Sequence, residues 1–145
     1  MKTALAEAEK ARQKDEVPIG AVIVCDGKII ARAHNLKEGT KKAIAHAELL
    51  AIEKANKKNG DWRLNDCELY VTIEPCLMCV GAIIQARLKK VVYGAPDKKF
   101  GAIESVVKSF EFKGWNHYPV IIGGVLAGEC ADIISKYFAA KRVKQ

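Results

Sequence analysis

Two short segments carry residues whose types and spacing suit metal-assisted hydrolysis. The first holds His46 and Glu48, and the second holds Cys76 and Cys79, the two cysteines of a Cys-x-x-Cys motif. Zinc prefers nitrogen and sulfur ligands in a tetrahedron, and a catalytic zinc site uses three protein ligands so that a fourth position can hold water. One imidazole and two thiolates make such a set, and they leave Glu48 unliganded as a base beside the metal.

Two helix starts must position these side chains. The Cys-x-x-Cys pair directly follows Pro75, and proline suits the beginning of a helix, so we predict a helix over 75–85. Residues three apart share a helix face, which allows both thiols to point at one metal. His46 and Glu48 are only two apart, so they can serve one site only where a second helix, predicted over 45–58, begins over the metal.

Spacing alone leaves three kinds of site open. The zinc could be catalytic, it could be structural with Cys67 or Cys130 as a fourth ligand, or the cysteines could simply be buried in the core. A structural site has no use for a carboxylate beside the metal, so Glu48 favours catalysis. The order His-x-Glu, then Pro-Cys-x-x-Cys, is also the signature of the zinc-dependent nucleobase deaminases.

Segments outside the zinc motif narrow the resemblance further. They are Glu16-Val17-Pro18-Ile19-Gly20-Ala21, His34-Asn35, Trp62-Arg63-Leu64, Leu69-Tyr70-Val71-Thr72, Glu74, Arg87, Val91-Val92-Tyr93-Gly94, Asn116-His117 and Glu129-Cys130. With Ala45-His46-Ala47-Glu48 and Pro75-Cys76, they make nearly the whole chain similar to the bacterial tRNA adenosine deaminases of the cytidine-deaminase-like superfamily. One departure stands out, because Lys42-Ala43-Ile44 replaces the Asp-Pro-Thr that usually precedes the first zinc segment.

The resemblance implies a reaction, a metal and partners. It implies hydrolytic deamination of adenosine to inosine at the wobble position of a tRNA anticodon loop, with Zn²⁺ bound by His46, Cys76 and Cys79. Glu48 is then the catalytic residue that carries protons, and the chain is expected to act as a homodimer. In this family an Asn hydrogen-bonds the purine edge, the backbone near the motif holds the base, and a loop after a strand packs against the RNA. The corresponding substrate-binding residues are Asn35, Ala47, Asp97, Lys98 and Lys99.

Other functions share the zinc signature. A deaminase of free guanine, free cytosine or a nucleoside is the alternative enzyme, and a scaffold or RNA-binding subunit with structural zinc is the non-enzymatic one. The two enzyme hypotheses differ in their response to salt. Binding of RNA should weaken steeply as ionic strength rises, whereas binding of a neutral base should hardly change.

Composition sets the outer limits. The 145 residues favour a single domain over 1–145, long enough to bury about 68–70% of the unfolded surface. Lys and Arg total 24 against 17 acidic residues, a net charge of +7 that suits RNA or simply a solvated basic surface. Five cysteines are an odd number, so we expect no disulfide framework and a reducing cytoplasm. The longest apolar runs, 76–84 and 119–126, are too short to span a bilayer.

The order of predicted elements gives the fold class. Strands and helices alternate after an N-terminal helix and a β-hairpin whose turn is Asp26-Gly27, while polar loops follow His34 and Gly94. Helices are expected at 3–14, 45–58, 75–85 and 128–142, and strands at 20–25, 28–33, 67–73, 90–93 and 120–122. This pattern predicts an α/β protein, a three-layer α/β/α domain around a central mixed sheet of about five strands. The resemblance implies the same fold, the cytidine-deaminase-like one.

Overall fold

An N-terminal β-hairpin begins the sheet. In the computed structural model, which describes residues 1–144, β1 (Gly20–Cys25) pairs antiparallel with β2 (Lys28–His34). The two turn residues between them, Asp26 and Gly27, have φ values of 50° and 75°. Positive φ at both central positions is the geometry of a tight hairpin turn, and Asn-Gly or Asp-Gly adopts it most readily. The predicted hairpin is therefore confirmed.

Five strands make up the sheet, in the order β2-β1-β3-β4-β5. β3 (Cys67–Ile73) pairs antiparallel with β1 and parallel with β4 (Lys90–Ala95), and β4 pairs parallel with β5 (Val120–Ile122). The carboxyl ends of β2, β3 and β4 consequently meet at one edge of the sheet. Segments far apart in the sequence, after His34, after Ile73 and after Ala95, thus come together there.

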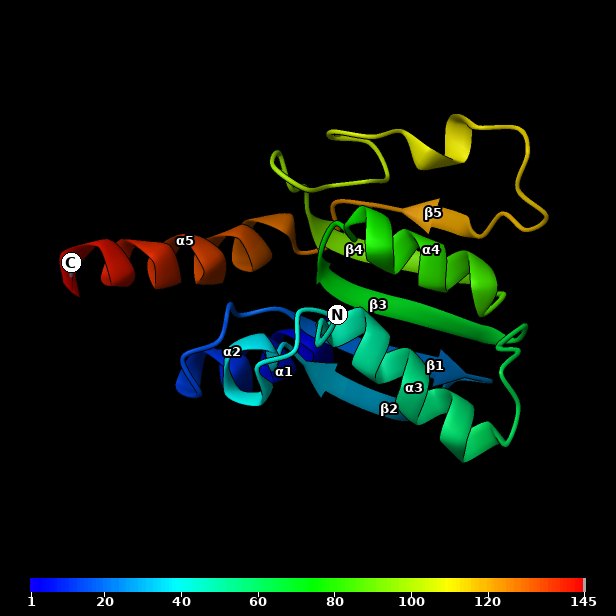
Figure 1. Ribbon diagram of the computed structural model, residues 1–145, viewed down its shortest axis with the longest axis horizontal. Coiled ribbons are helices and arrows are strands. Elements are labelled where there is room, and N and C mark those ends of the chain that lie inside the picture. Colours follow the sequence, from blue (N-terminus) through cyan, green and yellow to red (C-terminus); the bar gives the residue numbers. More distant parts are fainter. Residues whose placement is uncertain (145) are drawn as a thin grey trace.

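Helices cover both faces of the sheet (Figure 1). Two lie side by side on one face, and the other two long helices pack together on the opposite face. The helices are α1 (Lys2–Gln13), α2 (Lys37–Thr40), α3 (Ala47–Asn59), α4 (Leu77–Gln85) and α5 (Ala127–Lys144), with a short 3₁₀ turn at Ser109–Glu111. α3 and α4 form the first layer, while α1 and α5 form the second. The predicted three-layer α/β/α fold with a mixed five-stranded sheet is confirmed.

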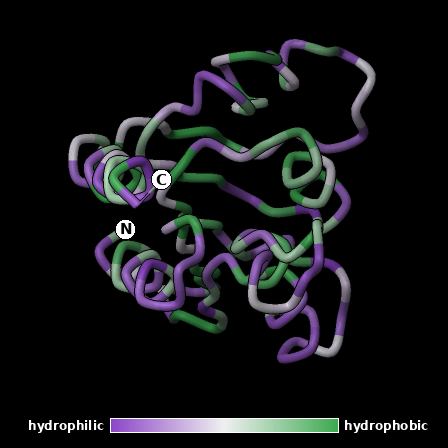
Figure 2. The backbone as a smooth tube through the Cα atoms, turned by 60° about the vertical axis from the view of Figure 1, so that its left-hand side comes forward, coloured by the Kyte–Doolittle hydropathy of each residue, from purple (hydrophilic) through white to green (hydrophobic). Residues whose placement is uncertain are grey.

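The core lies between the sheet and its helices. Fully buried apolar side chains come from the central strands and from α4, among them Ile23, Leu69, Val71, Ile83 and Val91. Figure 2 shows hydrophobic residues gathered along the strands in the middle of the molecule, with hydrophilic stretches on the outside. Burying this apolar area is the main favourable term that holds the site's framework in place. Within residues 1–144, none of the helices is long and apolar enough to cross a membrane.

Three sequence-based expectations about local structure are wrong. The stretch before Lys42 is not only loop, since α2 forms there. α2 begins where the buried carboxylate of Glu16 accepts the N–H groups of Glu38 and Gly39, a contact across more than twenty residues that no local pattern reveals. Neither zinc-segment helix starts where expected: the N-cap residues are His46 and Cys76, so α3 begins two residues later than predicted and Pro75 lies outside α4.

The cysteines also differ from expectation. Cys25 and Cys67 face each other at the end of the β1–β3 ladder and form a disulfide, with their Cα atoms 4.3 Å apart. Strand register brings them together, and a cysteine count cannot reveal register. The disulfide removes Cys67 from the possible fourth ligands. It leaves Cys76, Cys79 and Cys130 as free thiols.

Candidate active site

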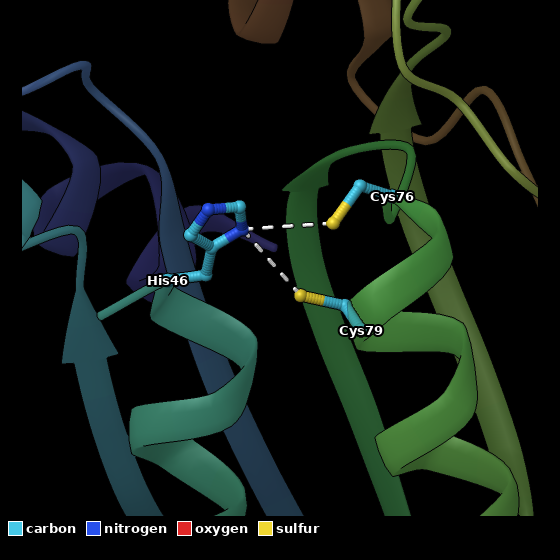
Figure 3. A group of neighbouring side chains, drawn as sticks. All are labelled: His46, Cys76 and Cys79. Carbon is cyan, nitrogen blue, oxygen red and sulfur yellow. Dashed lines mark hydrogen bonds between the residues drawn. The ribbon is translucent and has the colours of Figure 1, made fainter. Parts of the chain in front are cut away.

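Three potential metal ligands meet where α3 and α4 begin. The ligand atoms of His46, Cys76 and Cys79 all lie within 4.8 Å of one another. His46 Nδ1 is 3.6 Å from Cys76 Sγ and 3.7 Å from Cys79 Sγ, and Figure 3 shows the imidazole facing both sulfurs from the opposite helix. Ligands of a tetrahedral zinc, bound at ordinary Zn–N and Zn–S distances, are separated by about 3.6 Å. The donor set therefore fits zinc in both chemistry and spacing.

Each helix begins at a ligand. His46 is the N-cap of α3 and Cys76 the N-cap of α4, both with extended backbone. Neither side chain caps the amides of its own helix, so both remain directed at the shared site. Two residues that are two apart in a regular helix point in different directions. His46 and Glu48 avoid this restriction because His46 is the N-cap, with extended backbone, and only Glu48 lies in the first turn of the helix. Two helix N-termini also bring positive potential toward the thiolates.

The two thiols share one negative charge. A hydrogen bond from Cys79, assisted by the His46 ring, lowers the pKa of Cys76 to about 4. The same contact with Cys76, together with burial, raises the pKa of Cys79. The hydrogen bond with Cys76 also raises the pKa of His46. These three atoms therefore interact closely, and binding a divalent cation between them would require both thiols to lose their protons.

Glu48 lies beside this group and is only 3% exposed. Burial raises the pKa of its carboxyl to about 7, and the nearby charge of Cys76 acts in the same direction. A carboxyl group poised near neutral pH can both accept and donate a proton, which is the property required of a general acid–base residue.

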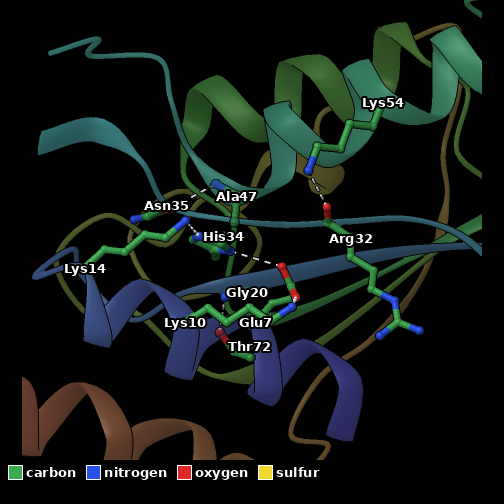
Figure 4. Close-up of polar contacts among 10 residues, drawn as sticks. All are labelled: Glu7, Lys10, Lys14, Gly20, Arg32, His34, Asn35, Ala47, Lys54 and Thr72. Atoms are coloured by element: carbon green, nitrogen blue, oxygen red, sulfur yellow. Dashed lines mark hydrogen bonds and ion pairs between the residues drawn. The ribbon is translucent and has the colours of Figure 1, made fainter. Parts of the chain in front are cut away.

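Asn35 and Ala47, two predicted substrate-binding residues, are in direct contact. Asn35 directly follows β2, is 6% exposed, and accepts the main-chain N–H of Ala47 through Oδ1 at 2.8 Å (Figure 4). This bond fixes the orientation of the Asn35 amide. It also occupies the N–H of Ala47, so that group supports Asn35 instead of facing the site.

A buried polar network supports the end of β2. His34 Nδ1 lies 3.0 Å from a carboxylate oxygen of Glu7, and His34 Nε2 lies 3.0 Å from the Lys14 ammonium (Figure 4). The Lys14 ammonium can only donate, so Nε2 accepts its hydrogen bond. Nδ1 then carries the ring N–H and donates a hydrogen bond to the Glu7 carboxylate. These contacts give His34 a supporting role beneath Asn35.

The loop after β4 holds the remaining predicted substrate contacts. Lys98 and Lys99 are exposed. The Asp97 carboxylate turns back onto its own loop and accepts the main-chain N–H groups of Lys99 and Phe100 at 3.0 and 3.2 Å. The structure therefore shows a hydrogen-bonded turn at this loop, with the two lysines exposed to solvent.

Two buried glutamates have roles that sequence reasoning missed. Glu16 supports α2, and Glu74 lies at the end of β3, directly before Pro75. Burial of Glu74 acts to raise its pKa, but hydrogen bonds from Ser105 and from main-chain N–H groups outweigh burial and lower the pKa overall. The only signal in the sequence was an acidic residue where an apolar strand ends. That signal does not say what the side chain binds.

The segment that replaces the family's usual Asp-Pro-Thr is exposed. Lys42, Ala43 and Ile44 are all at the surface, and the Ile44 side chain is 62% exposed next to His46. Among the described residues, no fourth His, Cys, Asp or Glu joins the three-ligand group. Cys130, the other possible fourth ligand, is instead buried against Gly94. The site is thus open on one side, as a catalytic metal site requires.

A three-layer α/β/α fold with a His, two Cys and a buried Glu at two helix starts defines a deaminase-type site. The chain belongs to the MafB19-like deaminase family, whose model matches residues 1–141. It is 48% identical over 145 residues to a tRNA-specific adenosine deaminase of Bacillus subtilis (strain 168), covering all of this chain and 90% of that protein. A tRNA-specific adenosine deaminase of Agrobacterium fabrum is 44% identical over 99% of this chain and 94% of its own.

Solved structures give the same picture. One, from a study of A-to-I editing by tRNA:A34 deaminases, matches with a TM-score of 0.89 and 45% identity over 92% of this chain and 96% of its own. A guanine deaminase from Bacillus subtilis matches with a TM-score of 0.64 and 34% identity over 97% of this chain and 90% of its own. The predicted family is confirmed. That the three grouped side chains bind zinc stays a prediction.

Proposed function

We propose that this protein is a zinc-dependent hydrolase that converts adenosine to inosine at the wobble position of a tRNA anticodon loop. The observation that carries the proposal is the spacing of His46, Cys76 and Cys79, with the buried carboxyl of Glu48 beside them. The tRNA-specific relatives support the choice of substrate, since they match nearly the full length of this chain at 44–48% identity.

His46, Cys76 and Cys79 would hold the zinc ion. When bound, zinc supplies a polarised water that is nucleophilic at neutral pH. Two thiolates and a neutral imidazole would cancel the charge of Zn²⁺, so zinc held by His46, Cys76 and Cys79 would be a weaker Lewis acid than zinc held by three imidazoles. Activation of the water would therefore depend more strongly on the neighbouring base, Glu48.

Glu48 carries the protons. Its carboxylate takes a proton from the water that attacks C6 of the purine and delivers it to N1. It then takes the proton of the new C6 hydroxyl and transfers it to the amino group, which leaves as ammonia as the C6 carbonyl forms, so that adenosine and water become inosine and ammonia. A raised pKa suits both transfers, because the same group must accept and release a proton during one turnover.

Asn35 selects the purine. Its Oδ1 is engaged by Ala47, which leaves the amide nitrogen as the group that donates to an acceptor on the base. In this proposal Ala47 contributes to substrate binding by fixing Asn35, and the adjoining backbone forms the wall against which the base lies.

The RNA is held outside the pocket by charge and by the loop after β4. Asp97, Lys98 and Lys99 lie on the loop that bonds to Glu74, two residues before Cys76, and the net charge of +7 favours a polyanion. Adenosine must leave its stack to reach a buried site, at a cost of a few kcal/mol that is smallest in a loop. An anticodon loop therefore suits this site better than a duplex.

We further propose a single domain over 1–145 that acts in the cytoplasm as a homodimer. The start of α4 presents apolar side chains on the surface, with Leu77 62% and Met78 37% exposed. An exposed apolar helix face of this kind is suited to a contact with a second copy.

The decisive experiment is mass spectrometry of products after incubation of the zinc-loaded protein with an RNA anticodon hairpin that contains a wobble adenosine. Inosine in the hairpin is the expected product. Free adenosine, guanine, cytosine and cytidine should remain unchanged in parallel reactions. Deamination of a free base with an untouched hairpin would replace the proposal with nucleobase salvage, the alternative that the 34% identity to a guanine deaminase favours.

A further inference from the structure

Glu74 makes more hydrogen bonds than an ordinary strand-end residue needs. Oε2 accepts the main-chain N–H groups of Ile103, Glu104 and Ser105 at 3.0, 2.8 and 3.0 Å. Oε1 accepts the N–H of Asp97 at 3.1 Å and the hydroxyl of Ser105. The side chain is 1% exposed, so five donors from one loop converge on a carboxylate that water hardly reaches.

The loop is built around this carboxylate. Gly101 N–H bonds to the Asp97 carbonyl, and Ala102 N–H bonds to the Pro75 carbonyl at 2.8 Å. A Cβ on Gly101 would collide with the Glu74 carboxyl and with the Asp97 carbonyl, so the backbone approaches the side chain as closely as only glycine allows. Residues 97–105 consequently have little freedom to move while Glu74 is in place.

Two distinct parts of the site meet at Glu74. One residue separates it from Cys76 in the chain, and the loop that it holds carries Asp97, Lys98 and Lys99. We propose that Glu74 is a positioning residue for the RNA substrate, which acts by fixing the 97–105 loop relative to the start of α4. The inference rests on the proposed function, because it assigns to this loop the binding of the RNA.

A glutamine cannot take over this role. All groups that face the two oxygens are donors, so an amide nitrogen in place of either oxygen would oppose at least one N–H. The hydroxyl of Ser105 can rotate to accept, whereas the N–H of Asp97 cannot. The amide nitrogen is therefore expected on the Oε1 side, where it loosens the Asp97 end of the loop and leaves the bonds to Ile103 and Glu104 intact.

The test is Glu74→Gln in the zinc-loaded protein with the anticodon hairpin. We expect KM for the hairpin, and its Kd by fluorescence anisotropy, to rise about tenfold, as lost hydrogen bonds to a buried charged group would cause. Zinc content and kcat at saturating hairpin should stay within about twofold, since the change leaves the three ligands and Glu48 intact. A loss of zinc together with kcat, at unchanged KM, would overturn the inference.

Three further variants separate positioning from a general loss of structure. Ser105→Ala removes one donor and should raise KM about twofold to threefold, so it carries the test even where Glu74→Gln does not fold. Glu68→Gln, at the far end of the same strand, loses a contact to Lys90 and should leave KM unchanged. In the Lys98→Ala/Lys99→Ala background, Glu74→Gln should weaken binding by less than it does alone. Equal effects in both backgrounds would contradict action through the loop.

The two proposals can fail separately. Wild-type protein that leaves the hairpin unmodified would overturn the proposed function and this inference with it. Wild-type protein that forms inosine, while Glu74→Gln and Ser105→Ala bind the hairpin as wild type does, would overturn the inference alone.

Discussion

α3 and α4 begin at the same site and with the same device, yet they contribute different things. Each starts at a metal-ligand candidate, His46 or Cys76, in extended conformation. α4 adds a second thiol, whereas α3 adds the buried acid Glu48 and the N–H that orients Asn35. The α4 side therefore supplies most of the metal binding, and the α3 side supplies the base and the contact to the purine.

The two helix starts are also supported differently. The α4 start is held directly, because Glu74 lies next to it in the chain and gathers five donors. The α3 start is held indirectly, through the hydrogen bond between Asn35 and Ala47. Asn35 directly follows His34, which is fixed by its hydrogen bond to Glu7. Replacement of a ligand, Cys76 or Cys79 on the α4 side or His46 on the α3 side, should therefore abolish metal binding. Replacement of Glu48 or Asn35 on the α3 side should alter turnover or selectivity with the metal retained.

The largest effect is expected for Cys79→Ser. A serine hydroxyl is a poor ligand for zinc compared with a thiolate, so zinc content should fall and inosine formation should drop to background. Zinc content by plasma mass spectrometry and inosine by liquid chromatography check this outcome. Cys130→Ser is the matched control, a buried thiol outside the site that should retain zinc. Full activity of Cys79→Ser without zinc would exclude the proposed site.

Glu48→Gln should separate metal binding from catalysis. Glutamine has the same shape but cannot take a proton from the attacking water, so kcat should fall about 10²- to 10⁴-fold. Zinc content should equal that of the wild type, in contrast to Cys79→Ser. Undiminished kcat with zinc bound would remove Glu48 from the mechanism.

A pair of changes at Asn35 tests the selective part of the α3 side. In Asn35→Asp the carboxylate can still accept the N–H of Ala47 but cannot donate to the purine, whereas Asn35→Ala loses both bonds. Loss of one buried hydrogen bond to the base costs about 1–3 kcal/mol, so kcat/KM of the Asp variant should fall roughly 5- to 150-fold. The kcat/KM of Asn35→Ala should fall further, because both hydrogen bonds are lost. Equal kcat/KM for wild type and both variants would show that Asn35 does not touch the base.

Local sequence patterns predicted much of this architecture. They failed where a local structure depends on contacts with residues distant in the sequence. The bounds of β1, β3 and β5 agree with the expected ranges, because short β-branched runs end at turn residues. The ligand set was also predictable, since Cys-x-x-Cys and His-x-Glu are each contained within a few residues. α2, the Cys25–Cys67 disulfide and the role of Glu74 depend on contacts across 22 to 42 residues, which become visible only when strand register is known.

The smallest effect on activity is expected beneath Asn35, at Glu7. Burial acts to raise the pKa of the Glu7 carboxyl, but hydrogen bonds from Lys10 and His34 outweigh burial and lower it below the ordinary value of 4.5. A carboxyl whose pKa is lower in the folded state stabilises the fold above its unfolded pKa, and this contribution is lost as the pH falls through the folded pKa. Glu7→Gln should therefore lower the free energy of unfolding by about 1.5–3 kcal/mol at pH 7.

The same change should cost progressively less below pH 4.5, where the Glu7 carboxyl of the unfolded chain becomes protonated, and least below the lower pKa of the folded protein. Urea unfolding at pH 7 and at pH 3.5 measures the difference, and Glu9→Gln is the matched control, an exposed glutamate of α1 that pairs with Arg12 at the surface. Zinc content should be unaffected, because Glu7 bonds to Lys10 and His34 and not to any of the three ligands. A Glu7→Gln protein that lost zinc would instead show that the network at Glu7 also supports a metal ligand, which its hydrogen bonds to His34 and Lys10 argue against.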